Sequence, residues 1–412
     1  MQEIGVDANF VCLDESTLAT YAETSRSFSI RAFIRAYKNF HESRCQSRFS
    51  AGRYAATLSL IWSRLVVIAW ISLTADAVVF KSGQSLSASG IDIKLYKACG
   101  VRVIFIFHGS DSRPPYLNAF YARRPVELLQ NWTVGTEKAV ARLAGMADYV
   151  IDNPAGAHFH KDERCVLYQV LGNPIDDERI ATSSGAPSGA APESNKRGLR
   201  VLHAPSLAEL KGSDLIRACI ERLRNEGYPI DYVELSGVSN SAVIAEIRKA
   251  DLVIDEMYSD IHGATLAMEA TACGCPVVVG GYCFDQLEKI VPKEFIPPTI
   301  TCRPEHLFET VKSLIDEPER LKDYRRRALE FYARVGSARE TAKRLLVLIE
   351  GKAPKEWFFN VQENRLVGVV AGPPAAALKN IRSLQEKYGA GALLLQDKPE
   401  LARDLPRIVE GL

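Results

Sequence analysis

Several features that would narrow the function are missing from this sequence. Acidic and basic residues nearly balance, 50 against 51, which leaves a formal net charge of +1, so no global positive field points to nucleic acid. The nine cysteines form no Cys-x-x-Cys pair, and Cys273 and Cys275 have no nearby histidines at metal-binding spacing. We therefore expect reduced thiols packed as small hydrophobic groups, with neither a metal nor disulfides.

The N-terminus also lacks the charged and then apolar start of a secretory leader, so we expect a cytoplasmic protein. The apolar run Leu65–Ile71 is bracketed by Arg64 and Asp76 and is too short to span a bilayer, which takes about 20 apolar residues. We expect a buried helix there, leading into a strand at Ala77–Phe80. A helix on the inner face of the membrane, making a peripheral membrane contact, is the alternative.

A chain of 412 residues is long enough for two or three domains, each with its own core. The run Thr182–Lys196 is rich in Ser, Gly, Ala and Pro and cannot build a core, so it reads as a linker. We predict a first domain over residues 1–181, a linker over 182–197, a second domain over 198–350 and a C-terminal extension over 351–412.

Strand and helix patterns alternate on both sides of this linker. Before it we expect strands at Ala8–Leu13, Ala77–Phe80, Val101–Phe107 and Tyr149–Asp152, with helices at Ile91–Cys99 and Val126–Met146. After it we expect strands at Arg200–His203, Ile230–Leu235, Leu252–Asp255 and Val277–Val279, with helices at Gly212–Asn225, Ser241–Lys249 and around Glu269. Such alternation predicts two α/β domains with parallel sheets, whose ligands lie at the carboxyl ends of the strands in one shared cleft.

The most informative stretch runs from Ile261 to Val279 and reads IHGATLAMEATACGCPVVV. A loop ends at Gly263, a short helix carries the single carboxylate of Glu269, and a Gly-x-Pro turn leads into a β-branched run typical of a buried strand. A lone acid on the first turns of a helix that faces a crevice suits hydrogen bonding to ribose hydroxyls.

This stretch resembles the donor-nucleotide signature of the large retaining group of GT-B glycosyltransferases, Gly…Glu-Ala-Met-Ala-x-Gly-x-Pro-Val-Val, with Thr271 in place of the usual methionine. The resemblance covers residues 200–350, is weaker over 76–176 and is absent from 352 onward. It implies two facing Rossmann-like domains and transfer of a sugar, with retention, from a nucleotide sugar to a glycan, lipid-linked or protein acceptor, as in polysaccharide biosynthesis. The nucleotide sugar is then a substrate, and no cofactor or metal is implied.

The resemblance also implies a donor site in the second half of the chain. Lys211-Gly212 matches the family's Lys-Gly at the start of a helix, where a cation beside a helix N-terminus attracts a pyrophosphate. Gly237 lets the backbone approach the nucleotide, His262 lies in the signature loop beside the donor sugar, and Glu269 binds the ribose. The acids Asp255-Glu256 either hydrogen-bond the donor or cap the loop.

In the first half, an apolar strand delivers the string His108-Gly109-Ser110-Asp111-Ser112-Arg113 to its carboxyl end. The string resembles the family's His-Gly-x-Asp-x-Arg loop, which faces the transferred sugar. By that resemblance His108 and Asp111 are the catalytic candidates, and Arg113 holds an anion on the acceptor side. His158 and His160 have no evident third ligand, so we expect no metal there.

The sequence departs from the family at two points. Ile261 stands where many members carry a second acid, although one subgroup lacks that acid too, and this chain resembles that subgroup best. The chain also begins at a turn that follows the family's first strand and helix, so we expect the first domain to lack its first strand. A sugar-nucleotide epimerase on the same fold and a non-catalytic GT-B-like binding module are the alternatives.

The C-terminal extension reads as a β-α-β-α unit. We expect strands at Leu366–Ala371 and Ala392–Gln396, and helices at Ala375–Lys387 and Glu400–Glu410. The unit is either an independent appendage or packs on the first domain in place of its missing strand.

Overall fold

The computed structural model describes residues 5–8, 27–45, 50–81, 84–87, 89–161, 164–175, 178, 180 and 198–412. The predicted linker at Thr182–Lys196 and nearly all of the predicted strand Ala8–Leu13 lie outside these residues. The chain divides into two compact units, Met1–Ile106 with Met146–Tyr149, and Phe107–Gly145 with Val150–Leu412. The predicted domain boundaries stay predictions.

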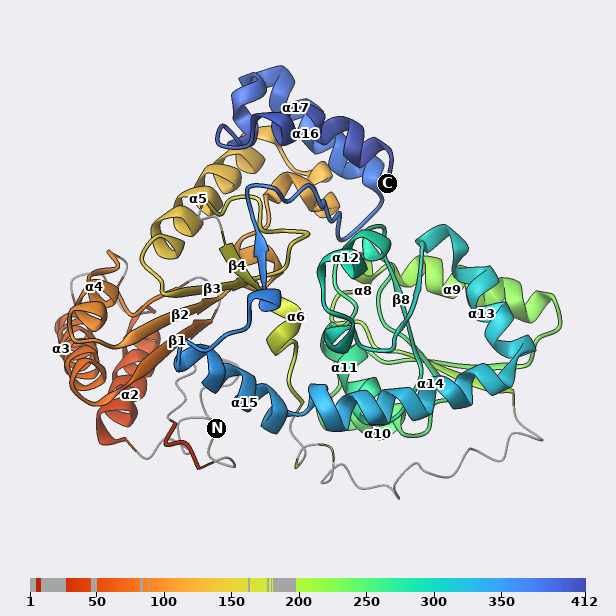
Figure 1. The fold of residues 1–412 in the computed structure, drawn as a ribbon, viewed down its shortest axis with the longest axis horizontal. Helices are drawn as coiled ribbons and strands as arrows, with labels where there is room; N and C mark the ends of the chain where they lie inside the picture. Colours follow the sequence, from red (N-terminus) through yellow and green to blue (C-terminus); the bar gives the residue numbers. More distant parts are fainter. Residues whose placement is uncertain are drawn as a thin grey trace. The chain divides into compact units, whose positions relative to one another are not determined.

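The first unit contains a helical hairpin and two parallel strands (Figure 1). Helix α2 (Phe28–Ser43) begins after Ser27 and helix α3 (Ala51–Thr74) after Ser50, and each serine side chain accepts a hydrogen bond from its helix's first turn. The two helices pack through Phe33, Leu60 and Val67. Strands β1 (Ala77–Lys81) and β2 (Arg102–Ile106) pair in parallel, with helix α4 (Ile91–Ala98) between them in the chain.

The burial expected for the helix before β1 is wrong. A helix does run into that strand, but it is longer than the apolar run that predicted it, and 28% of its most apolar window is buried. Its length and hydropathy are sufficient to cross a membrane. The run Leu65–Ile71 gave no sign of exposure because apolar content alone does not reveal which face of a helix has a protein partner.

The second unit contains a complete parallel sheet with the order β6-β5-β7-β8-β9. Its strands are β5 (Leu199–His203), β6 (Ile230–Glu234), β7 (Leu252–Ile254), β8 (Val277–Gly280) and β9 (Ile300–Cys302). Helices α9 (Ser213–Asn225) and α13 (Leu307–Asp316) bury their apolar stripes in one hydrophobic cluster, and α10 (Asn240–Ile247) and α11 (Thr265–Ala272) bury theirs in another. Leu252 and Ile254 of β7 enter the first cluster and Val253 the second, because successive strand side chains point to opposite faces.

A further sheet of the second unit contains three strands in the order β3-β4-β10. Strands β3 (Tyr149–Asp152) and β4 (Arg164–Leu167) are parallel, and β10 (Phe358–Asn360) is antiparallel to β4. The α/β class with two mainly parallel sheets is therefore confirmed. The strands β4, β9 and β10 were not predicted.

Long helices complete the second unit. These are α5 (Val126–Ala144), α14 (Pro318–Phe331), α15 (Ala338–Ile349), α16 (Pro374–Tyr388) and α17 (Pro399–Glu410), with shorter helices α6 (Tyr168–Leu171), α8 (Ala208–Lys211) and α12 (Phe284–Ile290). In the tail, α16 and α17 lie side by side and α16 contacts α5 (Figure 1). The Tyr116 hydroxyl donates to the Leu393 carbonyl oxygen at 3.1 Å, and the Asn380 side chain donates to the Asn118 carbonyl oxygen at 3.0 Å.

Both strands predicted in the tail are wrong. Residues Ala390–Leu393 form a 3₁₀ turn between α16 and α17, and Leu394 has φ +56°. The expected strand Leu366–Ala371 is largely buried, but apart from one bridge at Val370 it joins no sheet, and Ala371 has φ +59°. Apolar residues there predicted burial correctly, but the backbone hydrogen-bonds to irregular loops on both sides, which no pattern within the segment could reveal.

We name residues 364–372 the tail strap. Its Gly368 amide donates to the Ala155 carbonyl oxygen at 2.9 Å, and its Val370 carbonyl oxygen accepts from the Ala119 amide at 2.9 Å. On the other side, the Ala371 amide donates to the Tyr258 carbonyl oxygen at 3.4 Å. The strap therefore connects loops that follow β2 and β3 with the loop that follows β7.

Replacing Gly368 by alanine should lower the melting temperature of the second unit. A Cβ at this position would lie 2.6 Å from the Asp260 Cβ and 2.8 Å from the Ala155 Cβ, so the backbone must shift, at a cost of about 1–3 kcal/mol. Gly135→Ala in α5 is the matched control, because its Cβ meets nothing within 4 Å and alanine favours a helix by about 0.5–1 kcal/mol. Equal melting temperatures for the two variants, measured by calorimetry, would contradict the packing of the strap.

Candidate functional site

The carboxyl edge of the β6-β5-β7-β8-β9 sheet brings most of the predicted donor residues together. Strand β5 ends at His203, β6 at Glu234 and β7 at Ile254, and parallel strands present these ends at one edge. Lys211 ends the short helix α8 that follows β5, and Gly237 lies in the loop that follows β6. The Met257 amide donates to the Lys211 carbonyl oxygen at 3.0 Å, which connects the loop after β5 with the loop after β7.

Lys211 is held at this edge by acids. Its ammonium group forms an ion pair with the Glu256 carboxylate, and 24% of the lysine side chain and 13% of the glutamate side chain are exposed. Burial alone would lower the pKa of Lys211, but the charges of Glu256 and Asp255 outweigh it and raise that pKa. Lys211 therefore remains a cation at neutral pH, beside the start of α9.

Gly212 separates Lys211 from α9 and requires glycine for two reasons. Its φ is +72°, in the left-handed region that side chains disfavour. A Cβ there would also lie 2.8 Å from the Met257 Cβ. The chain can therefore turn sharply from the lysine into the helix, whose first N–H groups attract anions.

Asp255 caps helix α11 although it lies well before the helix in the sequence. The residue that precedes this helix, Ala264, has no side chain able to cap it. Instead the Ala267 amide, in the first turn, donates to the Asp255 carboxylate at 3.2 Å. Burial, with a further contribution from the Glu256 charge, raises the pKa of Asp255 to about 7.

Glu269, the predicted ribose ligand, is almost fully buried, with 2% of its surface exposed. The Asn240 side chain amide donates to its carboxylate at 2.7 Å. Asn240 is the first residue of α10 and follows the loop that contains Gly237, which is exposed and has φ +68°. The carboxylate thus lies against the loop after β6. Asn240 was not identified from the sequence, because an asparagine at the start of a helix reads as a cap.

His203 organises the same edge. It is fully buried, its Nδ1 lies 2.8 Å from the Ile254 carbonyl oxygen, and its Nε2 lies 2.7 Å from the Ser213 hydroxyl. Burial lowers its pKa, so the ring is neutral and joins the ends of β5 and β7 to the first residue of α9. We did not assign it a role from the sequence, where it was only the last residue of a strand.

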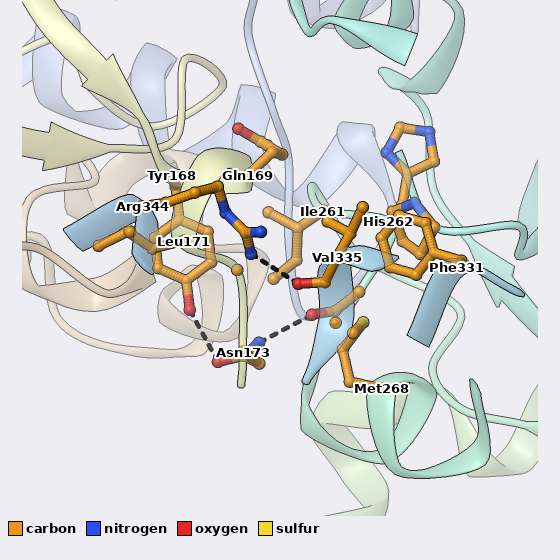
Figure 2. Close-up of a pocket in the computed structure, with 14 residues that line it drawn as sticks. Tyr168, Gln169, Leu171, Asn173, Ile261, His262, Met268, Phe331, Val335 and Arg344 are labelled. Carbon is orange, nitrogen blue, oxygen red and sulfur yellow. Dashed lines mark hydrogen bonds between the residues drawn. The ribbon is translucent and has the colours of Figure 1, made fainter. Parts of the chain in front are cut away.

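His262 and Gly263 line a different, small pocket of about 30 Å³, which has room for roughly one or two water molecules. The His262 ring lies 3.1 Å from the Glu288 carboxylate and 4.7 Å from the Phe284 ring centroid. Its Nδ1 is buried and has no hydrogen-bond partner among the described residues. Figure 2 shows Asn173 bridging the Tyr168 hydroxyl and the Gly263 carbonyl oxygen, at 2.7 Å each.

In the loop after β2, the predicted catalytic residues form a turn. The Asp111 carboxylate accepts from the His108 backbone amide at 3.0 Å, and the Asp111 amide donates to the His108 carbonyl oxygen at 3.0 Å. The His108 ring packs edge to face against Tyr168, with centroids 5.3 Å apart. Asp111 thus shapes the turn that presents the histidine.

Arg113, predicted to hold an anion on the acceptor side, is buried and paired with Asp260. Its Nε donates to the Asp260 carboxylate at 3.1 Å, and a terminal nitrogen donates to the same oxygen. The Asn153 side chain donates to the Asp260 carbonyl oxygen at 3.0 Å. Asp260 was not identified from the sequence, because nothing local indicates a partner 147 residues away.

A polar cavity of about 120 Å³ adjoins Arg113. It is lined by hydroxyl, amide and aromatic groups from the loop and from α5, with the rings of Tyr121 and Trp132 4.8 Å apart. Its other lining residues include Ser110, Asn118 and Thr136. Hydroxyl and amide groups beside an aromatic face are the kind of surface that binds a sugar.

Buried histidines lie near the end of β3. The His160 Nε2 lies 2.6 Å from the Asp152 carboxylate, and the His158 Nε2 donates to the Leu366 carbonyl oxygen at 2.8 Å. Burial lowers the pKa of His158 to about 4. Within the described part of the chain, no group of three or more His, Cys, Asp or Glu could hold a metal ion.

No protein-family model matches this chain, and no curated protein matches it in sequence. Solved structures with a similar fold include GT-B glycosyltransferases. A UDP-forming α,α-trehalose-phosphate synthase from Burkholderia xenovorans is 14% identical, over 79% of this chain and 85% of that one, with a TM-score of 0.44. Anabaena HepE in complex with UDP-glucose is 11% identical, over 73% and 89%, with a TM-score of 0.36. TarM from S. aureus, in a complex that contains UDP, is 10% identical, over 70% and 59%, with a TM-score of 0.44.

Asp255→Asn should stabilise the protein at pH 8 but not at pH 4. Because the folded-state pKa of Asp255, about 7, exceeds its unfolded value near 4, the wild type loses stability as the pH rises from 4 to 7. Asparagine can still accept from the Ala267 amide but carries no charge, so the gain at pH 8 should be about 1–3 kcal/mol. Thermal unfolding across this pH range measures it, with the exposed Asp316→Asn as control. A gain that does not change with pH would show that Asp255 titrates normally.

Proposed function

We propose that this chain is a GT-B glycosyltransferase that uses a nucleotide-sugar donor. The observation that carries the proposal is the position of Lys211, a cation held beside the N-terminus of α9 at the carboxyl edge of a parallel sheet. A cation and the unpaired N–H groups of a helix N-terminus together favour a pyrophosphate. The buried Glu269, on a helix at the same edge, supplies the acid that a ribose needs.

In the proposed reaction, the bond between the anomeric carbon and the diphosphate oxygen breaks, and its electron pair leaves with the diphosphate. An acceptor hydroxyl oxygen forms the new bond on the same face of the sugar, and its proton ends on the departing diphosphate. Lys211 and the dipole of α9 stabilise the charge that develops on the leaving group. His108, presented by the turn that Asp111 shapes, orients the transferred sugar, and the cavity beside Trp132 receives the acceptor.

Two other functions give different results in the same assay. One alternative is a binding module without transfer. It is favoured because Arg113, which was expected to hold an anion on the acceptor side, is instead paired with Asp260 beside the tail strap. An epimerase would use further acids and histidines around the sugar. Incubating the full-length protein with a panel of UDP, GDP, ADP and CDP sugars, and measuring donor hydrolysis, epimerisation and transfer, separates the three. Epimerised donor, or binding without any turnover, would reject the transferase.

Glu269→Ala should weaken binding of a nucleoside diphosphate by about 10- to 100-fold, because a lost charge-assisted hydrogen bond costs about 1.5–3 kcal/mol. Isothermal titration calorimetry with the four nucleoside diphosphates measures it. The exposed Glu319→Ala is the control, and circular dichroism checks that both variants fold. Unchanged affinity in folded Glu269→Ala would remove the proposed ribose contact.

Lys211→Met should weaken binding of the nucleoside diphosphate but leave binding of the nucleoside within about 2-fold, because only the diphosphate presents an anion. Lys249→Met is the matched control, a lysine paired with Glu246 on the surface of the same sheet domain. Equal losses for both ligands would show that Lys211 acts only through its ion pair with Glu256.

A further inference from the structure

Helix α3 exposes a continuous apolar face. Six large apolar side chains on it are between 49% and 81% exposed: Tyr54, Leu58, Ile61, Trp62, Leu65 and Leu73. At about 100° per residue these positions fall within a sector of about 120° on the helix. Isolated apolar residues on a surface are ordinary, but a continuous face of this kind marks an interaction site.

The opposite side of the helix already has its protein partner. Leu60 and Val67 are buried against Phe33 of α2, so the exposed face is not the side that the fold of this unit uses. The helix contains no acidic residue, and its two charges, Arg53 and Arg64, fall about 60–80° outside the nearer edge of the exposed sector, toward the side that packs on α2, at about 100° per residue. Together α2 and α3 contain five basic residues and a single acid, Glu42.

We propose that this apolar face of α3 docks onto the surface of an anionic lipid bilayer. A helix with an apolar face of this width lies in the interface plane, with that face buried about 5–10 Å among headgroups and acyl chains. Trp62 matches the preference of tryptophan for the headgroup level, and the excess of basic over acidic residues in α2 and α3 favours an anionic surface. The absence of acids from the helix removes the repulsion that an anionic surface would otherwise impose.

The helix lies on the membrane and does not cross it. Spanning would place Arg64 near the centre of the hydrocarbon and would separate Leu60 and Val67 from α2. Only Ala75 and Asp76 separate the end of the helix from β1, whose backbone belongs to a sheet. Docking parallel to the surface keeps these contacts intact.

The test is co-sedimentation of the purified full-length protein with phosphatidylcholine vesicles, with and without 30% phosphatidylglycerol. The wild type should bind the anionic vesicles, and the double variant Leu58→Glu with Trp62→Glu should reduce the bound fraction at least 5-fold. Leu128→Glu with Leu215→Glu, at two exposed leucines of the second unit, is the matched control and should bind as the wild type does. Both changes are on exposed side chains, and circular dichroism confirms folding.

Equal vesicle binding by the wild type and the Leu58–Trp62 variant would overturn the proposal, as would no binding by the wild type. Light scattering measures the oligomeric state and so tests whether the face instead binds a second copy of the chain. A wild-type dimer that the variant dissociates, without vesicle binding by either, would assign the face to self-association and reject the lipid. Quenching of tryptophan fluorescence by brominated lipids provides a second measurement, because it should be largely lost in Trp62→Phe.

Discussion

The buried carboxylate of Asp255 is the group on which the candidate donor site depends. It accepts from the first turn of α11, next to the ion pair that holds Lys211. A charge in this position costs free energy, and burial raises its pKa accordingly. In return, the single carboxylate of Asp255 fixes the positions of the end of β7, the start of α11 and Lys211. Glu269 lies on that same helix, so its position also depends on Asp255.

A buried ion pair holds the loop after β2 in a similar way. Arg113 and Asp260 are paired in a buried position, and the tail strap passes beside them with Gly368 against Asp260 and Ala155. Losing one partner of such a pair would leave an uncompensated buried charge. The tail is therefore a structural part of the second unit, since its backbone pairs with loops that follow β2, β3 and β7. The close packing around Arg113 and Asp260 is the main observation in favour of a binding module.

Much of the fold could be predicted from the sequence because the local hydrophobic pattern agrees with the observed burial. Val277–Gly280 is a fully buried strand, as its β-branched run predicted, and Val126–Ala144 is a helix with its apolar face inward. The tail shows where this reasoning fails. Leu366–Ala371 and Ala392–Gln396 have apolar runs and are largely buried, yet neither is a strand. Burial depends on composition, whereas membership of a sheet depends on a neighbouring strand with free backbone groups.

The sequence by itself determined the α/β class, the order of most strands and helices, and the residue types at the carboxyl edge, because each depends on neighbours within about ten positions along the chain. The tertiary structure decided which of these residues meet. Asn240 donates to Glu269, His203 joins β5 and β7 to α9, and Arg113 pairs with Asp260. It also decided that one side of α3 faces away from the protein. Such contacts join residues far apart in sequence, and short-range patterns contain no information about them.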